Sequence, residues 1–135
     1  MVSEHKLFDC TLKSLAEIRA WMRLVLEKGG STPKSGQFIL AIDELCTNAI
    51  EHQGDGDCMC NLSIKLTRSL NNYSAEITYS GKEFNLSSYD SLEIEELKEI
   101  GRKGGLGIRF IKNIVDDIKY QYHDNVNQYV LVKNF

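Results

Sequence analysis

Two groups of residues, far apart in the chain, have the types and spacing that magnesium-nucleotide chemistry requires. Glu44 and Asn48 stand four positions apart in a helical pattern, so one helix face would carry both a carboxylate and an amide oxygen. A glycine-rich cluster opens a second helical pattern, and backbone N–H groups at such a helix start bind phosphate oxygens. This cluster consists of Gly104, Gly105, Leu106 and Gly107. Together the two groups predict a site for a nucleotide and Mg²⁺.

The pair on the first helix suits this chemistry in two ways. Mg²⁺ prefers oxygen ligands and keeps part of its water shell, so the amide oxygen of Asn48 is a suitable ligand. Glu44, one turn earlier, is placed to orient or deprotonate an incoming hydroxyl. His52 lies on the same side of the helix, within about 80° of Glu44, but its position near the helix end also suits the helix dipole, and we assign it no catalysis. The alternative is that Glu44 and Asn48 belong to a solvated helix stripe.

The glycine cluster also has two simpler interpretations: a flexible linker, or a helix start that needs small residues for close packing. Arg102 and Lys103 precede the cluster, and cations beside free amides favour an anion site. A dinucleotide-binding motif does not fit, because no strand pattern runs directly into the glycines.

The periodicity of the chain predicts the elements that must position these residues. Ser14 and Glu17 have the form of a capping box, while Thr32 and Pro33 have the form of a helix start. We expect helices at residues 14–28, 31–52 and 104–115, and strands at 6–12, 58–67, 73–79, 118–122 and 129–133, with turns at 71–72 and 124–125. The strands alternate apolar and polar residues, so one face of the sheet is covered. The predicted fold is an α/β (α+β) two-layer sandwich with helices on one face of a mixed, mainly antiparallel sheet.

Bulk properties narrow the class of protein. A chain of 135 residues predicts one domain, residues 1–135. A net charge of −3 without a basic run argues against nucleic acid as a partner. No signal peptide or apolar membrane span is evident, and we expect a cytoplasmic protein with reduced cysteine thiols and no membrane contact.

Residues 82–103 are acidic and weakly periodic. A long loop of this kind in a compact domain is often a functional lid. We predict that its segment 86–103 is such a lid.

Residues 42–52 resemble the N-box of the anti-sigma-factor serine kinases, a branch of the histidine kinase and Hsp90-like (GHKL) ATPases, and residues 104–117 resemble the glycine box and following helix of that family. The resemblance covers almost the whole chain. It implies a histidine kinase-like ATPase fold in which Glu44 is the general base and Asn48 the Mg²⁺ ligand. It also implies that segment 86–103 is an ATP lid. The expected ATP-binding residues are Asn48, Gly81, Lys103, Gly104, Gly105, Leu106 and Gly107.

The sequence departs from the family pattern at two positions that are expected to bind adenine. Residues 77–85 resemble the family's D-x-G-x-x-F-D box, but Tyr79 stands where the adenine-binding aspartate is expected. Asn127 and Gln128 stand where the family has Gly-Thr. Two outcomes are open: the hydroxyl of Tyr79, or one beside it, replaces the missing carboxylate, or the tyrosine fills the pocket.

The resemblance leads to two hypotheses. In the first, the chain is an ATP-dependent regulatory serine/threonine kinase that binds a sigma factor and phosphorylates a serine of an anti-anti-sigma (STAS-like) partner. In the second, it is a degenerate member that does not bind ATP and acts only as a protein-interaction module in partner switching. A homodimer is expected from the family alone.

Overall fold

The structure is a computed structural model that describes residues 1–53, 61–85 and 104–135, with the backbone alone at 104–106. Most of the predicted elements are present. In chain order they are β1 (Val2–Phe8), α1 (Ser14–Leu26), α2 (Pro33–Gln53), β2 (Leu62–Arg68), β3 (Asn72–Ser80), α4 (Gly104–Ile114), β4 (Asp117–His123) and β5 (Val126–Asn134).

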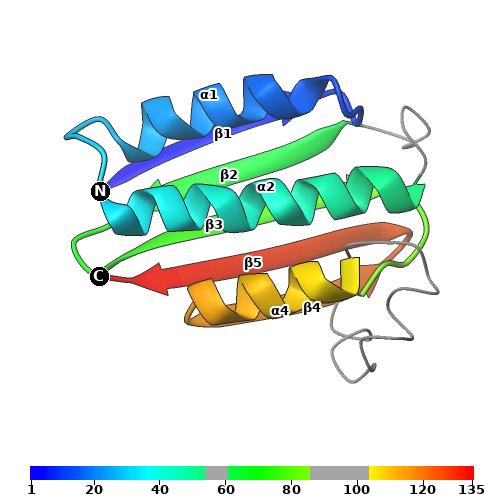
Figure 1. Cartoon of the computed structure of the whole chain (residues 1–135). Coiled ribbons are helices and arrows are strands. Elements are labelled where there is room, and N and C mark those ends of the chain that lie inside the picture. Colours follow the sequence, from blue (N-terminus) through cyan, green and yellow to red (C-terminus); the bar gives the residue numbers. More distant parts are fainter. Residues whose placement is uncertain (54–60, 86–103) are drawn as a thin grey trace.

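The strands form one sheet in the order β1-β2-β3-β5-β4, and each neighbouring pair is antiparallel. The helices α1, α2 and α4 lie side by side over one face of this sheet (Figure 1). The two-layer sandwich predicted from the sequence is therefore confirmed. α2 runs over the middle of the sheet, between α1 and α4, so its two flanks contact different helices.

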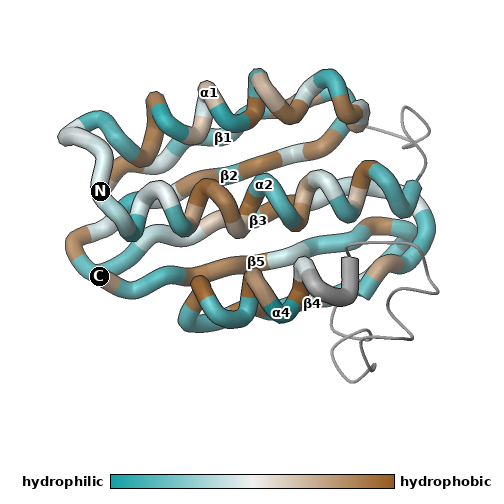
Figure 2. The backbone as a smooth tube through the Cα atoms, viewed as in Figure 1, coloured by the Kyte–Doolittle hydropathy of each residue, from teal (hydrophilic) through white to brown (hydrophobic). Residues whose placement is uncertain are grey.

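The core lies between the helices and the sheet. Apolar and polar segments alternate along helices and strands (Figure 2). In β3 the alternation is strict, with every second residue from Tyr73 to Tyr79 buried. The predicted stripe of α2 is buried as well, and it consists of Phe38, Ile42, Leu45 and Ala49. This packing fixes the rotation of α2 and so determines which of its residues lie along its flanks.

The two helix starts have different outcomes. At α2 the prediction is confirmed: Pro33 is the first helical residue, and Thr32 Oγ1 accepts a hydrogen bond from the Ser35 N–H at 3.1 Å. At α1 the capping box is wrong. Lys13 is the N-cap and makes no side-chain cap bond, while Ser14 lies inside the helix with its Oγ 3.0 Å from Thr11 Oγ1.

The first strand begins earlier and ends earlier than predicted. β1 pairs with β2 from Val2 opposite Arg68 to Phe8 opposite Leu62. Residues 3–6 are all polar, so this part of the strand has no apolar alternation that could reveal it. β1 is an edge strand, and its ladder with β2 determines where it begins and ends. By contrast, the predicted turn at 124–125 is confirmed: Asp124 and Asn125 both have positive φ, as a tight hairpin turn requires.

The cysteines differ in part from expectation. Cys46 is a buried free thiol, but Cys10 is disulfide-bonded, so the prediction of reduced thiols is wrong for Cys10. Cys58 and Cys60 lie outside the described residues. None of the helices in the described ranges is long and apolar enough to cross a membrane.

Candidate functional site

Glu44 and Asn48 interact directly on the flank of α2. The Asn48 side-chain amide donates to the Glu44 carbonyl at 2.9 Å and to Glu44 Oε1 at 3.2 Å. Asn48 is 2% exposed, so it does not belong to a solvated stripe. Because the amide nitrogen is directed at Glu44, the planar amide directs its oxygen away from that carboxylate.

Gly107, in the glycine cluster, lies directly against Glu44 and Asn48. A Cβ placed on Gly107 would lie 2.7 Å from both Asn48 Nδ2 and Glu44 Oε1. Such a distance is shorter than side chains tolerate, so the first turn of α4 packs against this pair as only glycine allows. The two motifs, separated in sequence, therefore meet in the structure.

The helix that follows the glycines begins where the sequence predicts. α4 starts at Gly104 and includes Gly105 and Leu106 in its first turn. The N–H groups of a first helical turn have no partner within the helix, and they carry the positive end of the helix dipole. This end of α4 is therefore suited to phosphate. Lys103 and the predicted lid at 86–103 lie outside the described residues, and their roles stay predictions.

The groups at this site fit Mg²⁺ held together with a nucleotide. The carboxylate of Glu44 and the amide of Asn48 offer oxygen donors, which Mg²⁺ prefers. Within the described residues no cluster of three or more His, Cys, Asp or Glu side chains could hold a metal by itself. A metal at Asn48 would accordingly take further oxygens from phosphate and water, as Mg²⁺ does in nucleotide sites.

Gly81, the other predicted nucleotide contact, has a structural reason to be glycine. Its φ is +148°, and a Cβ there would lie 2.8 Å from Cδ of Gln53. The Gln53 amide crosses this point to bond the backbone of Lys82, donating to its carbonyl at 2.8 Å and accepting from its N–H at 3.0 Å. The sequence analysis missed Gln53, because a glutamine at a helix end carries no signal for a partner 29 residues away.

Tyr79 is 1% exposed, and its hydroxyl has no hydrogen-bond partner among the described residues. Burial raises the pKa of this hydroxyl far above its ordinary value, with smaller contributions from Tyr129 and Tyr120. The Tyr79 ring therefore packs in the core, and both outcomes left open for the adenine stay predictions.

Asn127 lies opposite Tyr79 in the ladder of β3 and β5 and is fully buried. Its Oδ1 accepts from the Phe84 N–H at 2.9 Å and from the Tyr120 hydroxyl at 2.6 Å. Its Nδ2 donates to the Lys82 carbonyl at 2.9 Å. Asn127 therefore anchors the segment after β3, a role that the sequence analysis did not predict.

The contacts of Gln128 and His52 are with other side chains of the fold, and neither residue is among the candidate ligands. Gln128 follows the buried Asn127 in β5, so its side chain lies on the sheet face away from the helices. There its amide donates to Glu76 at 2.5 Å. His52 lies one turn beyond Asn48, and its ring stacks on Phe84 with centroids 4.0 Å apart.

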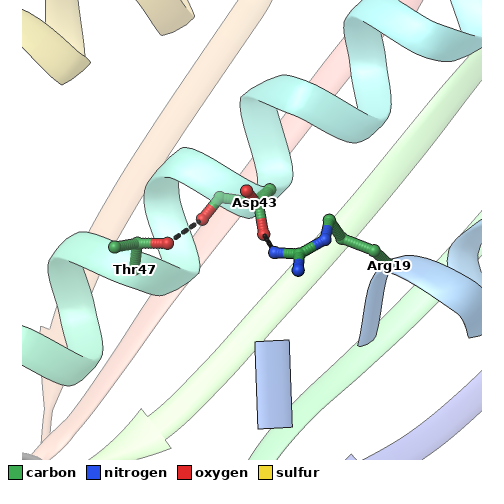
Figure 3. A network of polar contacts seen from close by, with 3 residues as sticks. All are labelled: Arg19, Asp43 and Thr47. Atoms are coloured by element: carbon green, nitrogen blue, oxygen red, sulfur yellow. Dashed lines mark hydrogen bonds and ion pairs between the residues drawn. The ribbon is translucent and has the colours of Figure 1, made fainter. Parts of the chain in front are cut away.

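The opposite flank of α2 is tied to α1 (Figure 3). Arg19 on α1 donates to Asp43 Oδ1 at 3.0 Å, and Thr47 Oγ1 donates to the Asp43 carbonyl at 2.7 Å. Asp43 thus contacts α1 while its neighbour Glu44 lies against Gly107 of α4. This ion pair helps to hold the rotation of α2 that the site requires.

The chain is similar to known proteins in sequence and in fold. The family described as the histidine kinase-like ATPase domain matches residues 8–133. The serine-protein kinases RsbW of Listeria monocytogenes serotype 4a and serotype 4b are each 25% identical over 92 residues, which cover 65% of this chain. That match spans 59% of the length of each relative.

A solved structure shows the same fold. The crystal structure of the RsbU and RsbW domains of Rv1364c from Mycobacterium tuberculosis superposes with a TM-score of 0.68 at 15% identity. The superposition covers 98% of this chain and 32% of the other.

Proposed function

Since the chain belongs to the histidine kinase-like ATPase domain family, we propose that it binds ATP with Mg²⁺ and acts as a regulatory serine/threonine protein kinase of the anti-sigma type. The observation that carries the proposal is the meeting of Glu44, Asn48 and Gly107. A carboxylate, an amide and a helix N-terminus within contact distance of one another are the parts that phosphoryl transfer needs.

In this proposal the first turn of α4 binds the triphosphate through its backbone N–H groups, at residues 104–107, with Lys103 adding a positive charge. Asn48 holds Mg²⁺, which when bound neutralises charge on the phosphates. Gly81 lines the nucleotide side of the turn after β3, and segment 86–103 covers the site.

Glu44 acts as the general base. The acceptor serine oxygen attacks the γ-phosphorus and forms the new P–O bond, while the bond between that phosphorus and the β,γ-bridging oxygen breaks. The serine hydroxyl proton passes to the Glu44 carboxylate, and ADP leaves. The Asn48 amide hydrogen bond orients the carboxylate for this step.

The acceptor is proposed to be a serine of an anti-anti-sigma, STAS-like protein, with a sigma factor as the alternative partner and a homodimer as the working assembly. The likeness to the serine-protein kinases RsbW supports this class of partner. A cytoplasmic location follows from the same proposal, because ATP and sigma factors are found there.

Titration calorimetry with ATP, with and without Mg²⁺, tests the nucleotide part. We expect Mg²⁺-dependent binding that Asn48→Ala removes. Transfer of the γ-phosphate to a candidate STAS-like protein tests the kinase part. Here Glu44→Gln should abolish transfer and leave binding within a few-fold of wild type, roughly the pattern of a lost transition-state interaction.

Glu17→Gln is a matched control for Glu44→Gln. It makes the same chemical change on α1, where the Glu17 carboxylate is exposed and contacts only Lys6 among the described ion pairs, at 3.6 Å. This variant should transfer phosphate like wild type. Normal transfer by Glu44→Gln would show that Glu44 is not the base.

A second function is favoured by one observation, the burial of Tyr79 at 1% exposure in the position expected to read adenine. If that side chain closes the nucleotide site, the chain is a protein-interaction module that switches partners without ATP. It would then show no thermal shift with Mg-ATP, yet form a stable complex with an anti-anti-sigma or sigma protein.

A further inference from the structure

Two large apolar side chains, Leu40 on α2 and Phe110 on α4, are exposed close to the candidate site. Leu40 is 53% exposed and Phe110 is 43% exposed. Leu40 precedes Glu44 by four residues, so the two lie on one side of α2. Phe110 follows Gly107 by three residues, so these two lie on one side of α4. Each apolar side chain is therefore one helical turn away from a residue of the site.

The directions of the two helices bring this apolar pair together. α2 and α4 run in opposite directions over the sheet (Figure 1), so a step toward the start of α2 and a step toward the end of α4 go the same way. At a rise of 1.5 Å per residue, Leu40 lies about 6 Å from Glu44 along the helix axis. Phe110 lies about 4.5 Å from Gly107 in the same manner. Because Gly107 packs on Glu44, both apolar side chains lie on one side of that contact.

The order of residues along α2 determines which side this is. In the proposed mechanism Asn48 holds Mg²⁺ beside the phosphates at the N-terminal end of α4, and Glu44, one turn earlier, accepts the proton. In phosphoryl transfer the attacking and leaving oxygens are roughly in line, on opposite sides of the phosphorus. With the nucleotide at the N-terminal end of α4, the acceptor serine approaches from the opposite side, where Leu40 lies.

We infer that Leu40 and Phe110 bind an apolar side chain of the acceptor protein that lies two or three residues from its phosphorylated serine. The serine oxygen must come within hydrogen-bond reach of the Glu44 carboxylate, about 3 Å. An extended chain advances by at most about 3.5 Å per residue, so two or three residues span the distance to the apolar pair. The inference rests on the proposed function and adds to it the kind of acceptor segment that the kinase recognises.

The chemistry of the apolar pair determines what it accepts and what it rejects. Leu40 and Phe110 offer apolar surface, and they recognise an apolar residue through the area that both partners remove from water. Glu44 beside them is half-buried, so its carboxylate is accessible from the same side. An acidic acceptor residue at this place would lose hydration and lie close to the Glu44 carboxylate, which disfavours it.

The first test measures phosphate transfer to the STAS-like acceptor at saturating Mg-ATP. Leu40→Ala and Phe110→Ala should each raise the KM for the acceptor about three- to tenfold. Both kcat and the dissociation constant of Mg-ATP should stay within about twofold of wild type, because a docking contact is the same in the ground state and the transition state.

Leu24→Ala is the matched control. It makes the same change at a leucine that is 71% exposed on α1, a helix that α2 separates from α4 (Figure 1), and it should behave like wild type. An unchanged acceptor KM in both Leu40→Ala and Phe110→Ala would overturn the inference and leave the kinase proposal intact. Absence of transfer by wild type to every STAS-like acceptor tested would overturn both.

The acceptor provides the second test. Its phosphorylated serine is located by mass spectrometry, and the apolar residue two or three positions away is replaced by alanine. This change should raise the KM about three- to tenfold with the wild-type kinase. With a kinase that carries both Leu40→Ala and Phe110→Ala it should have less than about a twofold effect, because the same contact is already lost. Equal effects on both kinases, or an acceptor without an apolar residue at those positions, would overturn the inference.

Discussion

Gly107 on α4 packs so closely on Glu44 of α2 that a methyl group at position 107 would lie 2.7 Å from Glu44 Oε1 and 3.1 Å from its Cγ. The same group would lie 2.7 Å from Asn48 Nδ2. The relationship joins the two sequence motifs at one point and makes position 107 sensitive to a single added carbon.

Gly107→Ala should therefore displace Glu44 and Asn48. We expect a loss of unfolding free energy on the order of 1–3 kcal/mol, as for other overpacked sites, and a loss of Mg-ATP binding. Urea denaturation and titration calorimetry measure the two effects. Gly36→Ala is the control, because it lies in α2 with nothing within 4 Å of the added carbon. It should stabilise the protein by up to about 1 kcal/mol through helix propensity, and equal effects of the two changes would contradict the packing described.

Tyr79→Phe removes a buried hydroxyl that has no partner in the described part of the chain. Unfolding free energy should stay the same or rise by about 1 kcal/mol, because an unpaired buried polar group is costly. Tyr129→Phe is the matched change, since its hydroxyl donates to the Phe84 carbonyl. That variant should lose about 1–2 kcal/mol. A larger loss in Tyr79→Phe than in Tyr129→Phe, in thermal or urea unfolding, would mean that the Tyr79 hydroxyl has a partner.

Gly81 and Gln53 should be energetically coupled. Gly81→Ala places a carbon against the Gln53 amide at a positive φ, and Gln53→Ala removes both bonds to the Lys82 peptide. Each single change should cost about 1–3 kcal/mol. The double variant should cost less than the sum, because removal of the amide relieves the overlap. Strict additivity in a double-mutant cycle would argue against this contact.

Stability should depend on pH through Glu27. The Ser35 hydroxyl donates to its carboxylate at 2.6 Å and lowers the Glu27 pKa below its ordinary value, with a further contribution from Ser31. Because the pKa is lower in the folded state, this stabilisation is present above the unfolded-state pKa near 4.5 and is lost as the pH falls through the folded-state pKa.

The measurement is the difference in unfolding free energy between wild type and Glu27→Gln as a function of pH. The difference should be constant at neutral pH and shrink in acid. Introduced into a Ser35→Ala background, Glu27→Gln should give a much flatter curve, because the donor that lowers the pKa is gone. An unchanged pH dependence in that background would assign the effect to another group.

The sequence by itself determined most of the helices and strands. Apolar alternation in β3 and the apolar stripe of α2 are short-range patterns, and each predicted the buried face that the structure has. The start of α2 was also predicted from the sequence. There the backbone N–H groups of Thr32 and Ser35 each donate to the hydroxyl of the other residue, within one turn. The sequence also predicted that Glu44 and Asn48 share one face of α2, because their spacing matches one helical turn, and the two side chains bond each other.

Only the tertiary structure decided what surrounds those residues. The contact of Gly107 with Glu44, the clamp of Gln53 on Lys82 and the anchoring of Phe84 by Asn127 each join elements distant in the chain. No local period encodes such pairs, because they depend on sheet register and on the rotation of α2 between its neighbours. For the same reason the sequence shows Tyr79 only as a missing carboxylate, whereas its neighbours in the fold make it a buried side chain.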